Sequence, residues 1–393
     1  MIGAGIFAAL GPAAEAAGAA ILVSLLIAGL IAWCNATSSA ELAANYPESG
    51  GTYVYGRERL GEWWGYLAGW GFVTGKTASC AAMALVFGAY VSPDLTRPLA
   101  VAAVVLLTAL NYRGIARTVS ATKVILTVVL ACLAGVVIAS LFGGGAGSDN
   151  LRPFFDSGPY GILQGAAILF FAFAGYARIA TLGEEIRDPA RTIRRAVPIA
   201  LGIALVVYAL VIGSALLAVG PTALADSAAP LETAVSAGSF EWFSPAVKAG
   251  AAIASLGVLL SMIAGVSRTT LAMARRRDLP GYFAAVHPTY RVPHHADLVI
   301  AVIVCAVVLL TDLRGAIAFS AFTILLYYAI TNASALTLRP PERTRSRWIF
   351  AFGLVGCLIL AATLPPGAIA AGIAILAAGA VGRLIARTAE PAP

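Results

Sequence analysis

Long apolar runs separated by short charged or Gly/Pro-containing breaks make up most of this 393-residue chain. A helix needs ~20 mainly apolar residues to cross a bilayer, and most of the runs reach that length. The pattern therefore predicts an all-α integral membrane protein with about twelve spans. The runs are 2–11, 19–41, 62–91, 98–111, 118–142, 160–185, 196–219, 243–274, 297–311, 314–338, 347–364 and 367–387.

The first run is too short to span, because Gly11 and Pro12 follow only about ten apolar residues. It predicts half a helix, directed outward, with the cytoplasmic half absent. Two explanations are open. The start codon is assigned late and the native protein has an N-terminal extension, or the chain is truncated and its function is impaired.

Composition supports the membrane assignment and excludes several other classes. Hydrophobic residues form 60% of the chain and charged residues 11%, whereas soluble domains carry roughly 25% charged residues. The net charge of +7 comes from arginines in short loops and forms no basic patch, so a nucleic-acid partner is not expected. The five cysteines lie singly inside apolar runs and the three histidines share one loop, so neither a metal site nor a cofactor is expected.

The distribution of arginines predicts the orientation of the chain. Arginine is concentrated in alternate breaks, whereas the other breaks are acidic, and positively charged loops are typically cytoplasmic. The C-terminus is therefore expected in the cytoplasm, in a multi-pass protein of the cytoplasmic membrane. The positive breaks include Arg57, Arg113, Arg187, Arg275, Arg343 and Arg383, and the acidic breaks include Asp94, Asp149, Asp156, Asp226 and Glu232.

Span lengths repeat along the chain. The third and eighth runs are both near 30 residues, and the fourth and ninth are both near 15. Because each half has five spans, an odd number, the second half must be inverted in the membrane. Glycine-interrupted segments occur in the first span of each half, at 3–7 and 170–178. Interrupted helices at matching places in two inverted halves indicate a transporter binding site.

The two interrupted segments have complementary chemistry. Free N–H groups at the start of the first helix favour an anion such as a carboxylate. Carbonyls released where the sixth span breaks, around Phe173–Gly175, favour a cation such as an ammonium group. A site that accepts both charges suits a free amino acid. The alternative is that these glycines only allow close helix packing.

Five stretches resemble the amino acid–polyamine–organocation superfamily of permeases. They are MIGAGIF at 1–7, ELAANYPESGGTYVY at 41–55, NYRGIARTVSATKV at 111–124, FFAFAGYARIATLGEEIRDPARTI at 170–193 and GVSRTTLAMARRRDLPGYFAAVHPTYRVPHHA at 265–296. The resemblance implies a LeuT-type five-plus-five inverted repeat. Its transport core would be residues 1–338, with repeats 1–142 and 160–338. Residues 339–393 would form two peripheral helices and a short cytoplasmic tail.

The resemblance also implies roles for individual residues. Amides at Ala4 and Gly5 would receive the substrate carboxylate, and carbonyls near Met1, Ile2, Phe171 and Ala174 would hold the amino group. Phe171 would be the aromatic gate; the alternative is an ordinary core or lipid-facing aromatic. The expected substrate-binding residues are Met1, Ile2, Gly3, Ala4, Gly5, Phe171, Ala172, Phe173, Ala174 and Gly175.

Charged residues within spans are candidates for coupling. Many superfamily members carry a lysine midway along the fifth span, but here that position is close to Val129. Lys76, deep in the third run, is the first candidate; it is either a proton-coupling group or a fixed cation satisfied by carbonyls. Arg178, after the break in the sixth span, is the second candidate, although a tie to a nearby carboxylate is the favoured interpretation.

The sequence thus predicts a secondary active permease for amino acids or related amines, working by alternating access. No phosphate-binding loop or nucleophile elbow is present, and enzymatic activity is not expected. The expected partners are the amine substrate, membrane lipid and, as a candidate coupling ion, the proton. The alternatives are a membrane sensor that binds an amino acid without moving it, and an inactive truncated permease. Side-chain selectivity is expected from Thr77 and Ser79 with Phe319, Ser320 and Phe322.

Overall fold

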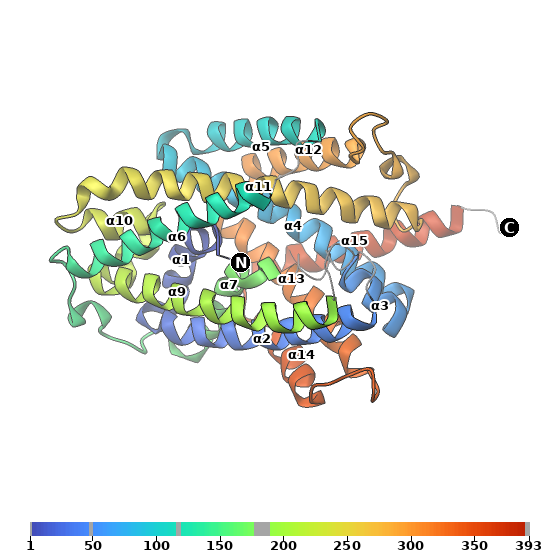
Figure 1. Cartoon of the computed structure of the whole chain (residues 1–393), viewed down its shortest axis with the longest axis horizontal. Coiled ribbons are helices and arrows are strands. Elements are labelled where there is room, and N and C mark those ends of the chain that lie inside the picture. The colour runs from blue at the N-terminus through green and yellow to red at the C-terminus, as the bar shows by residue number, and fades with distance from the viewer. Residues whose placement is uncertain (1, 47–49, 115–118, 177–188, 390–393) are drawn as a thin grey trace.

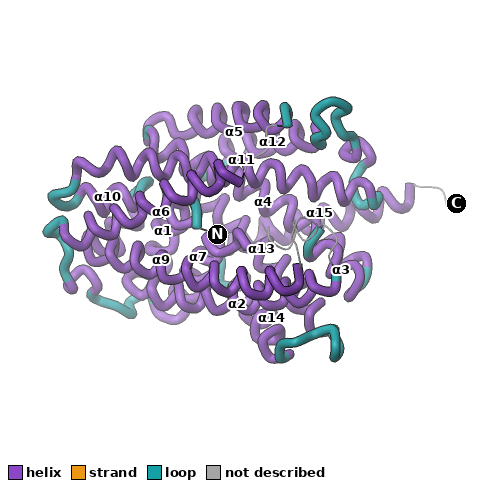
Figure 2. The backbone as a smooth tube through the Cα atoms, viewed as in Figure 1, coloured by secondary structure: helices purple, strands orange, loops and turns teal. Residues whose placement is uncertain are grey.

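A computed structural model describes residues 2–46, 50–114, 119–176 and 189–389, and these residues form helices and connecting loops without a strand (Figures 1 and 2). The α-helices, in order, are α1 (Gly5–Ala17), α2 (Ile21–Asn45), α3 (Thr52–Leu60), α4 (Glu62–Val91), α5 (Thr96–Tyr112), α6 (Val119–Phe142), α7 (Gly158–Phe173), α9 (Pro189–Asp226), α10 (Pro230–Ser236), α11 (Ser244–Arg275), α12 (His294–Leu310), α13 (Leu313–Leu336), α14 (Arg347–Ala362) and α15 (Pro366–Ala389).

Within the described residues, eight helical stretches are long and apolar enough to cross a bilayer. Three shorter apolar helices, α7, α12 and α14, accompany them. The outer surface is apolar, as lipid contact requires. Among its exposed side chains are Leu106, Ile199, Val206, Val302, Leu310 and Ile373. The predicted all-α membrane class is therefore confirmed.

Two helix ends can be compared with the ends that the sequence predicted. The expectation that Gly11 and Pro12 end the first helix is wrong, because α1 continues through Pro12 to Ala17. A proline inside a helix removes one hydrogen bond, and membrane proteins tolerate this where neighbouring elements cover the backbone; Pro12 is buried. In α9, by contrast, the helical backbone is interrupted at Gly220, directly after the predicted end at 219.

The lengths of corresponding helices agree closely between the two halves. α4 and α11 have 30 and 32 residues, α5 and α12 have 17 each, and α6 and α13 have 24 each. A short helix also follows the second span of each half, α3 in the first and α10 in the second. These short helices lie at opposite ends of the long axis in Figure 1, as inversion of the second half requires.

The centre of the bundle is α4, which packs against both α11 and α13. Polar side chains join the helices where little space separates them. The hydroxyls of Ser79 on α4 and Ser320 on α13 are 2.6 Å apart, and those of Thr52 on α3 and Thr331 on α13 are also 2.6 Å apart. Such hydrogen bonds fix neighbouring helices in register where lipid offers no competing partner.

A buried carboxylate joins several helices at the arginine-rich end of the bundle. Asp278, just after α11, accepts hydrogen bonds from Tyr53 Oη at 2.6 Å, Arg57 at 3.1 Å and Arg383 at 2.5 Å. The guanidinium of Arg383 on α15 also lies 4.8 Å from the Trp63 ring centroid and 4.6 Å from that of Tyr66. The last helix is therefore bound to α3, α4 and the end of α11.

Candidate functional site

The first helix begins without a side-chain cap. Ala4 occupies the N-cap position and its side chain can accept no hydrogen bond, so α1 starts at Gly5 with main-chain N–H groups that the helix itself does not pair. Gly3 and Ala4 are buried, whereas Ile2 and Gly5 are half-buried. These N–H groups and the positive end of the helix dipole are therefore directed into the protein interior.

The α-helix of the sixth span ends where the sequence predicts a break. α7 stops at Phe173, and residues Ala174–Tyr176 form a 3₁₀ turn. The Ala174 N–H donates to the carbonyls of Phe170 and Phe171. The Phe171 carbonyl is thus already engaged in this turn and has one lone pair left, which differs from the free carbonyl that a break alone suggests.

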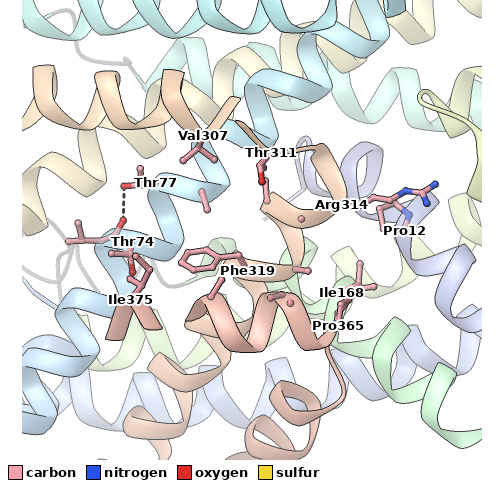
Figure 3. Close-up of a pocket in the computed structure, with 18 of the residues that line it drawn as sticks. Pro12, Thr74, Thr77, Ile168, Val307, Thr311, Arg314, Phe319, Pro365 and Ile375 are labelled. Atoms are coloured by element: carbon pink, nitrogen blue, oxygen red, sulfur yellow. Dashed lines mark hydrogen bonds between the residues drawn. The ribbon is translucent and has the colours of Figure 1, made fainter. Parts of the chain in front are cut away.

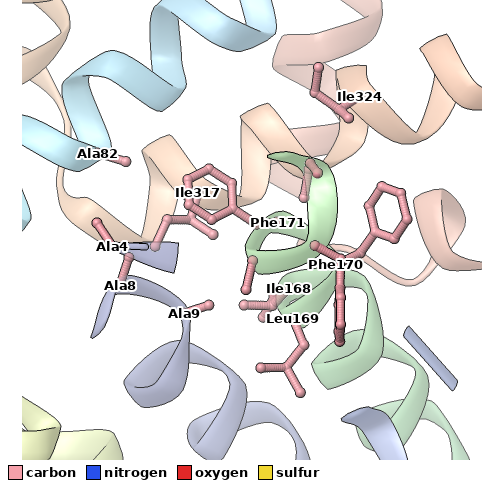
Figure 4. Close-up of a cluster of buried hydrophobic side chains, with 14 of the residues drawn as sticks. Ala4, Ala8, Ala9, Ala82, Ile168, Leu169, Phe170, Phe171, Ile317 and Ile324 are labelled. Carbon is pink, nitrogen blue, oxygen red and sulfur yellow. The ribbon is translucent and has the colours of Figure 1, made fainter. Parts of the chain in front are cut away.

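The two helix ends meet. A Cβ atom on Gly5 would lie 2.7 Å from the Cα atom of Ala172, so only glycine allows this approach. On its other side the chain meets α11, because a Cβ on Gly3 would lie 3.0 Å from Val258 Cγ2. Figure 4 shows Ala4, directly before α1, near the end of α7 that carries Phe171.

A tyrosine that the sequence analysis did not single out completes the contact. Tyr208 on α9 is fully buried, and its hydroxyl donates to the Ala172 carbonyl at 3.2 Å. Its ring also packs edge-on against Phe173, with centroids 5.3 Å apart. Tyr208 lies 36 residues beyond Ala172, so no local motif could have indicated the pairing.

The electrostatics of this meeting point come from the main chain. The described residues 2–5 and 171–175 carry no charged side chain. The positive end of α1 therefore faces the carbonyl end of α7, an arrangement in which each helix end offers hydrogen bonds of one polarity. Such a pair of ends can bind a small molecule that carries a negative and a positive group side by side.

The predicted substrate residues on both segments lie close together, as far as the described residues extend. Phe171, Ala172, Phe173 and Ala174 are buried and Gly175 is exposed. In Figure 4 the ring of Phe171 points away from the α7 axis toward α1 and Ile317 of α13. Met1 and Arg178 lie outside the described residues, so the roles expected for them stay predictions.

Lys76 is buried without a described partner. Its side chain is on α4, the residue is 7% exposed, and no ion pair or hydrogen bond joins it to any residue that the structure describes. Cys80, one turn further along α4, is the neighbouring ionisable group. The fixed-cation interpretation required carbonyl partners for Lys76, and the described part of the chain supplies none.

The residues expected to read the substrate side chain separate into two groups. Ser79 and Ser320 hydrogen-bond to each other between α4 and α13. Thr77 and Phe319 instead line a cavity between α4, α12, α13 and α15, which α1 and α7 also border. That cavity includes none of residues 3–5 or 171–175, so it lies beside the two helix ends and not between them.

Comparison with known proteins identifies the family. The sequence matches the amino acid permease family over residues 1–390. The chain belongs to this family. Its members are membrane transporters with the LeuT-type fold, so the resemblance to the superfamily and the expected LeuT-type fold are confirmed, whereas the count of twelve spans stays a prediction.

Individual relatives are similar over most of the chain. An uncharacterized transporter of Mycobacterium tuberculosis is 57% identical over 394 residues, which covers 99% of this chain and 90% of that protein. The chloroplastic cationic amino acid transporter 7 of Arabidopsis thaliana is 28% identical, over 85% of this chain and 62% of its own length. The methylthioribose transporter of Bacillus subtilis is 29% identical, over 75% of this chain and 68% of its own.

Proposed function

We propose that this protein is a secondary active permease that moves free amino acids across the cytoplasmic membrane by alternating access. The observation that carries the proposal is the meeting of Gly5 at the start of α1 with Ala172 at the end of α7. Family membership supports transport as the activity. In this class of fold, one half-bundle rocks around a site near the middle of the membrane.

In this proposal the main chain recognises the part that all amino acids share. The amides of Ala4 and Gly5 receive the carboxylate, since helix N-termini favour anions. The amino group is held by carbonyls of Ile2, Phe171 and Ala174, and by Met1. Phe171 covers the bound amino acid as a gate, and its burial between α1 and α13 supports that role.

The names of the relatives suggest which substrates to test first. Cationic amino acids head the panel because several Arabidopsis relatives carry that name. Methylthioribose is included because a relative of similar identity is named for it. Methylthioribose has no amino acid head, so its transport would argue against the main-chain site described above.

The orientation belongs to the same proposal. The end of the bundle with Arg57, Arg383 and the loop that contains Arg343 faces the cytoplasm, as positively charged loops typically do. The C-terminus then lies in the cytoplasm, and the end with Glu15 and Asp156 faces outward. Single cysteines are introduced at the two ends of the bundle and labelled from outside in intact cells, which distinguishes this orientation from its reverse.

A radiolabelled uptake panel in proteoliposomes tests the proposed function. Saturable uptake of at least one amino acid, competed by its unlabelled form, is the expected result. Binding to the purified protein without uptake would instead assign a sensor. The absence of both binding and uptake for every amino acid in the panel would contradict the proposal.

A further inference from the structure

A large crevice is lined by α4, α12, α13 and α15, and at its acidic end by α1 and α7 as well (Figure 3). Its volume is about 1380 Å³, and it extends from the acidic end of the bundle, at Arg314 and Pro365, toward the arginine-rich end, at Pro280. Of its walls, α4, α13 and α15 are long and apolar enough to cross a bilayer, and α12 is a shorter apolar helix. Residues 2–5 and 171–175, which the proposed function assigns to the head of the amino acid, do not line it.

The middle of the crevice is apolar. Two threonines of α4 that line it, Thr74 and Thr77, return their hydroxyls to the carbonyls of Trp70 and Val73 on their own helix, at 2.9 and 2.7 Å. The Trp70 indole N–H donates to the Ile375 carbonyl at 2.8 Å. With these polar groups satisfied, the part of the wall that α4 and α15 form is apolar, and apolar surfaces of this kind hold little water.

The acidic end of the crevice carries charges of both signs. Arg314 and Glu15 form an ion pair of 2.6 Å, and their side chains remain 45% and 54% exposed. Arg314 also donates to the Ala225 carbonyl at 2.5 Å. Asp156 lines the same end, and no ion pair joins it to any described residue. Two carboxylates against one guanidinium leave an excess negative charge at the mouth.

We infer that this crevice binds a phospholipid whose headgroup carries an ammonium, with phosphatidylethanolamine as the occupant. One acyl chain lies along the apolar middle, the phosphate approaches Arg314, and the ammonium is placed between Glu15 and Asp156. An anionic glycerol headgroup would meet two carboxylates and is disfavoured. This pattern of charges selects the lipid in a way that a uniform apolar face could not.

The dimensions fit a lipid of a single leaflet. α12 has 17 residues, which at ~1.5 Å per residue span roughly 25 Å. Half of a ~30 Å hydrocarbon core is about 15 Å, so a chain entering at the acidic end remains within the crevice. Small residues on α15, Ala368 and Ala371, leave the space that the chain occupies.

The test measures lipid retained by purified protein. Protein is reconstituted in nanodiscs of phosphatidylethanolamine, phosphatidylglycerol and phosphatidylcholine in equal amounts, extracted into detergent, and its bound lipids are quantified by mass spectrometry. Ala371→Phe fills the crevice. Ala377→Phe makes the same change at an exposed position of α15 that does not line the crevice, and is the matched control. Asp156→Asn removes one carboxylate in an exposed loop and leaves the apolar walls intact.

The wild type and Ala377→Phe should retain phosphatidylethanolamine in excess over phosphatidylglycerol, and Ala371→Phe should lose that excess. Asp156→Asn should retain lipid but with its preference shifted toward phosphatidylglycerol. Equal retention in Ala371→Phe and the wild type would overturn the inference. The absence of a headgroup preference in the wild type would also overturn it. A wild-type dimer that Ala371→Phe dissociates would overturn it as well, because a second copy of the chain would then occupy the crevice.

Discussion

Gly5 and Ala172 touch so closely that a Cβ on Gly5 would lie 2.7 Å from the Ala172 Cα atom. Because that neighbour is backbone, it cannot move aside as a flexible side chain would. The contact brings the two interrupted spans together, and any residue larger than glycine must separate them.

Gly5→Ala should therefore reduce transport more than it reduces stability. Separation of the helix ends by even a fraction of an ångström disturbs both halves of the proposed site, and a tenfold loss of transport rate corresponds to only ~1.4 kcal/mol. Initial uptake rates in proteoliposomes, normalised to folded protein, measure the effect. Gly202→Ala on α9 is the control, because no atom lies within 4 Å of a Cβ there; an equal loss in both variants would contradict the prediction.

Lys76 gives a test of proton coupling. A charged side chain costs ~2.5–3.5 kcal/mol in the middle of a membrane-spanning helix, and Lys76 has no described partner to offset that cost. If it carries the coupled proton, uptake by the wild type should vary with pH and this variation should vanish in Lys76→Met. Lys76→Arg should also abolish it, since arginine stays charged. Survival of the pH dependence in Lys76→Met would exclude the proton role.

The pair of Arg383 and Asp278 predicts a large effect on stability. Their side chains are 1% and 2% exposed, and the two are 2.5 Å apart. Removal of one partner from a buried pair costs ~3–5 kcal/mol. Asp278 keeps Arg57 and Tyr53 as partners when Arg383 is lost, so a cost toward the lower end of that range is expected. Arg383→Met should lower the unfolding temperature substantially, and the additional change Asp278→Asn should restore part of it. Arg97→Met, at an exposed position, should have little effect; an equally small effect at Arg383 would contradict the prediction.

Acid should weaken a second ion pair, between Arg59 of α3 and Glu342 in the loop before α14. A hydrogen bond from Arg59 at 2.5 Å holds the pKa of Glu342 below its ordinary value of 4.5. A lowered pKa in the folded state gives stability that is present above the ordinary value and is lost as the pH falls through the lowered one. The difference in unfolding temperature between the wild type and Glu342→Gln should therefore be positive at neutral pH and vanish in acid. A difference that does not change with pH would contradict this assignment.

The sequence alone predicted the features that depend on residues close together in the chain. Run length located α4 at 62–91, and the glycine pattern located the end of α7 near Phe173. The matching lengths of α5 and α12 followed from counting residues between breaks. Each of these depends on how many consecutive residues can hydrogen-bond their backbone groups within one helix in a membrane.

Features that depend on contacts between distant residues could not be predicted in this way. Arg383 and Asp278 are 105 residues apart, and the sequence assigned Arg383 only to a positively charged end. Tyr208 resembled any other aromatic within an apolar run. Pro12 was expected to end a helix because the hydrogen bond that a proline removes can be inferred from the sequence. The packing that covers the backbone of α1 cannot be inferred in this way.

The most direct test of the account is a structure of the protein with a transported amino acid bound. The account predicts the substrate carboxylate within hydrogen-bonding distance of the Ala4 and Gly5 amides, and the ammonium at carbonyls of the α7 end, near Phe171 and Ala174. A substrate bound in the crevice between α12 and α15, or at any place away from both helix ends, would contradict it.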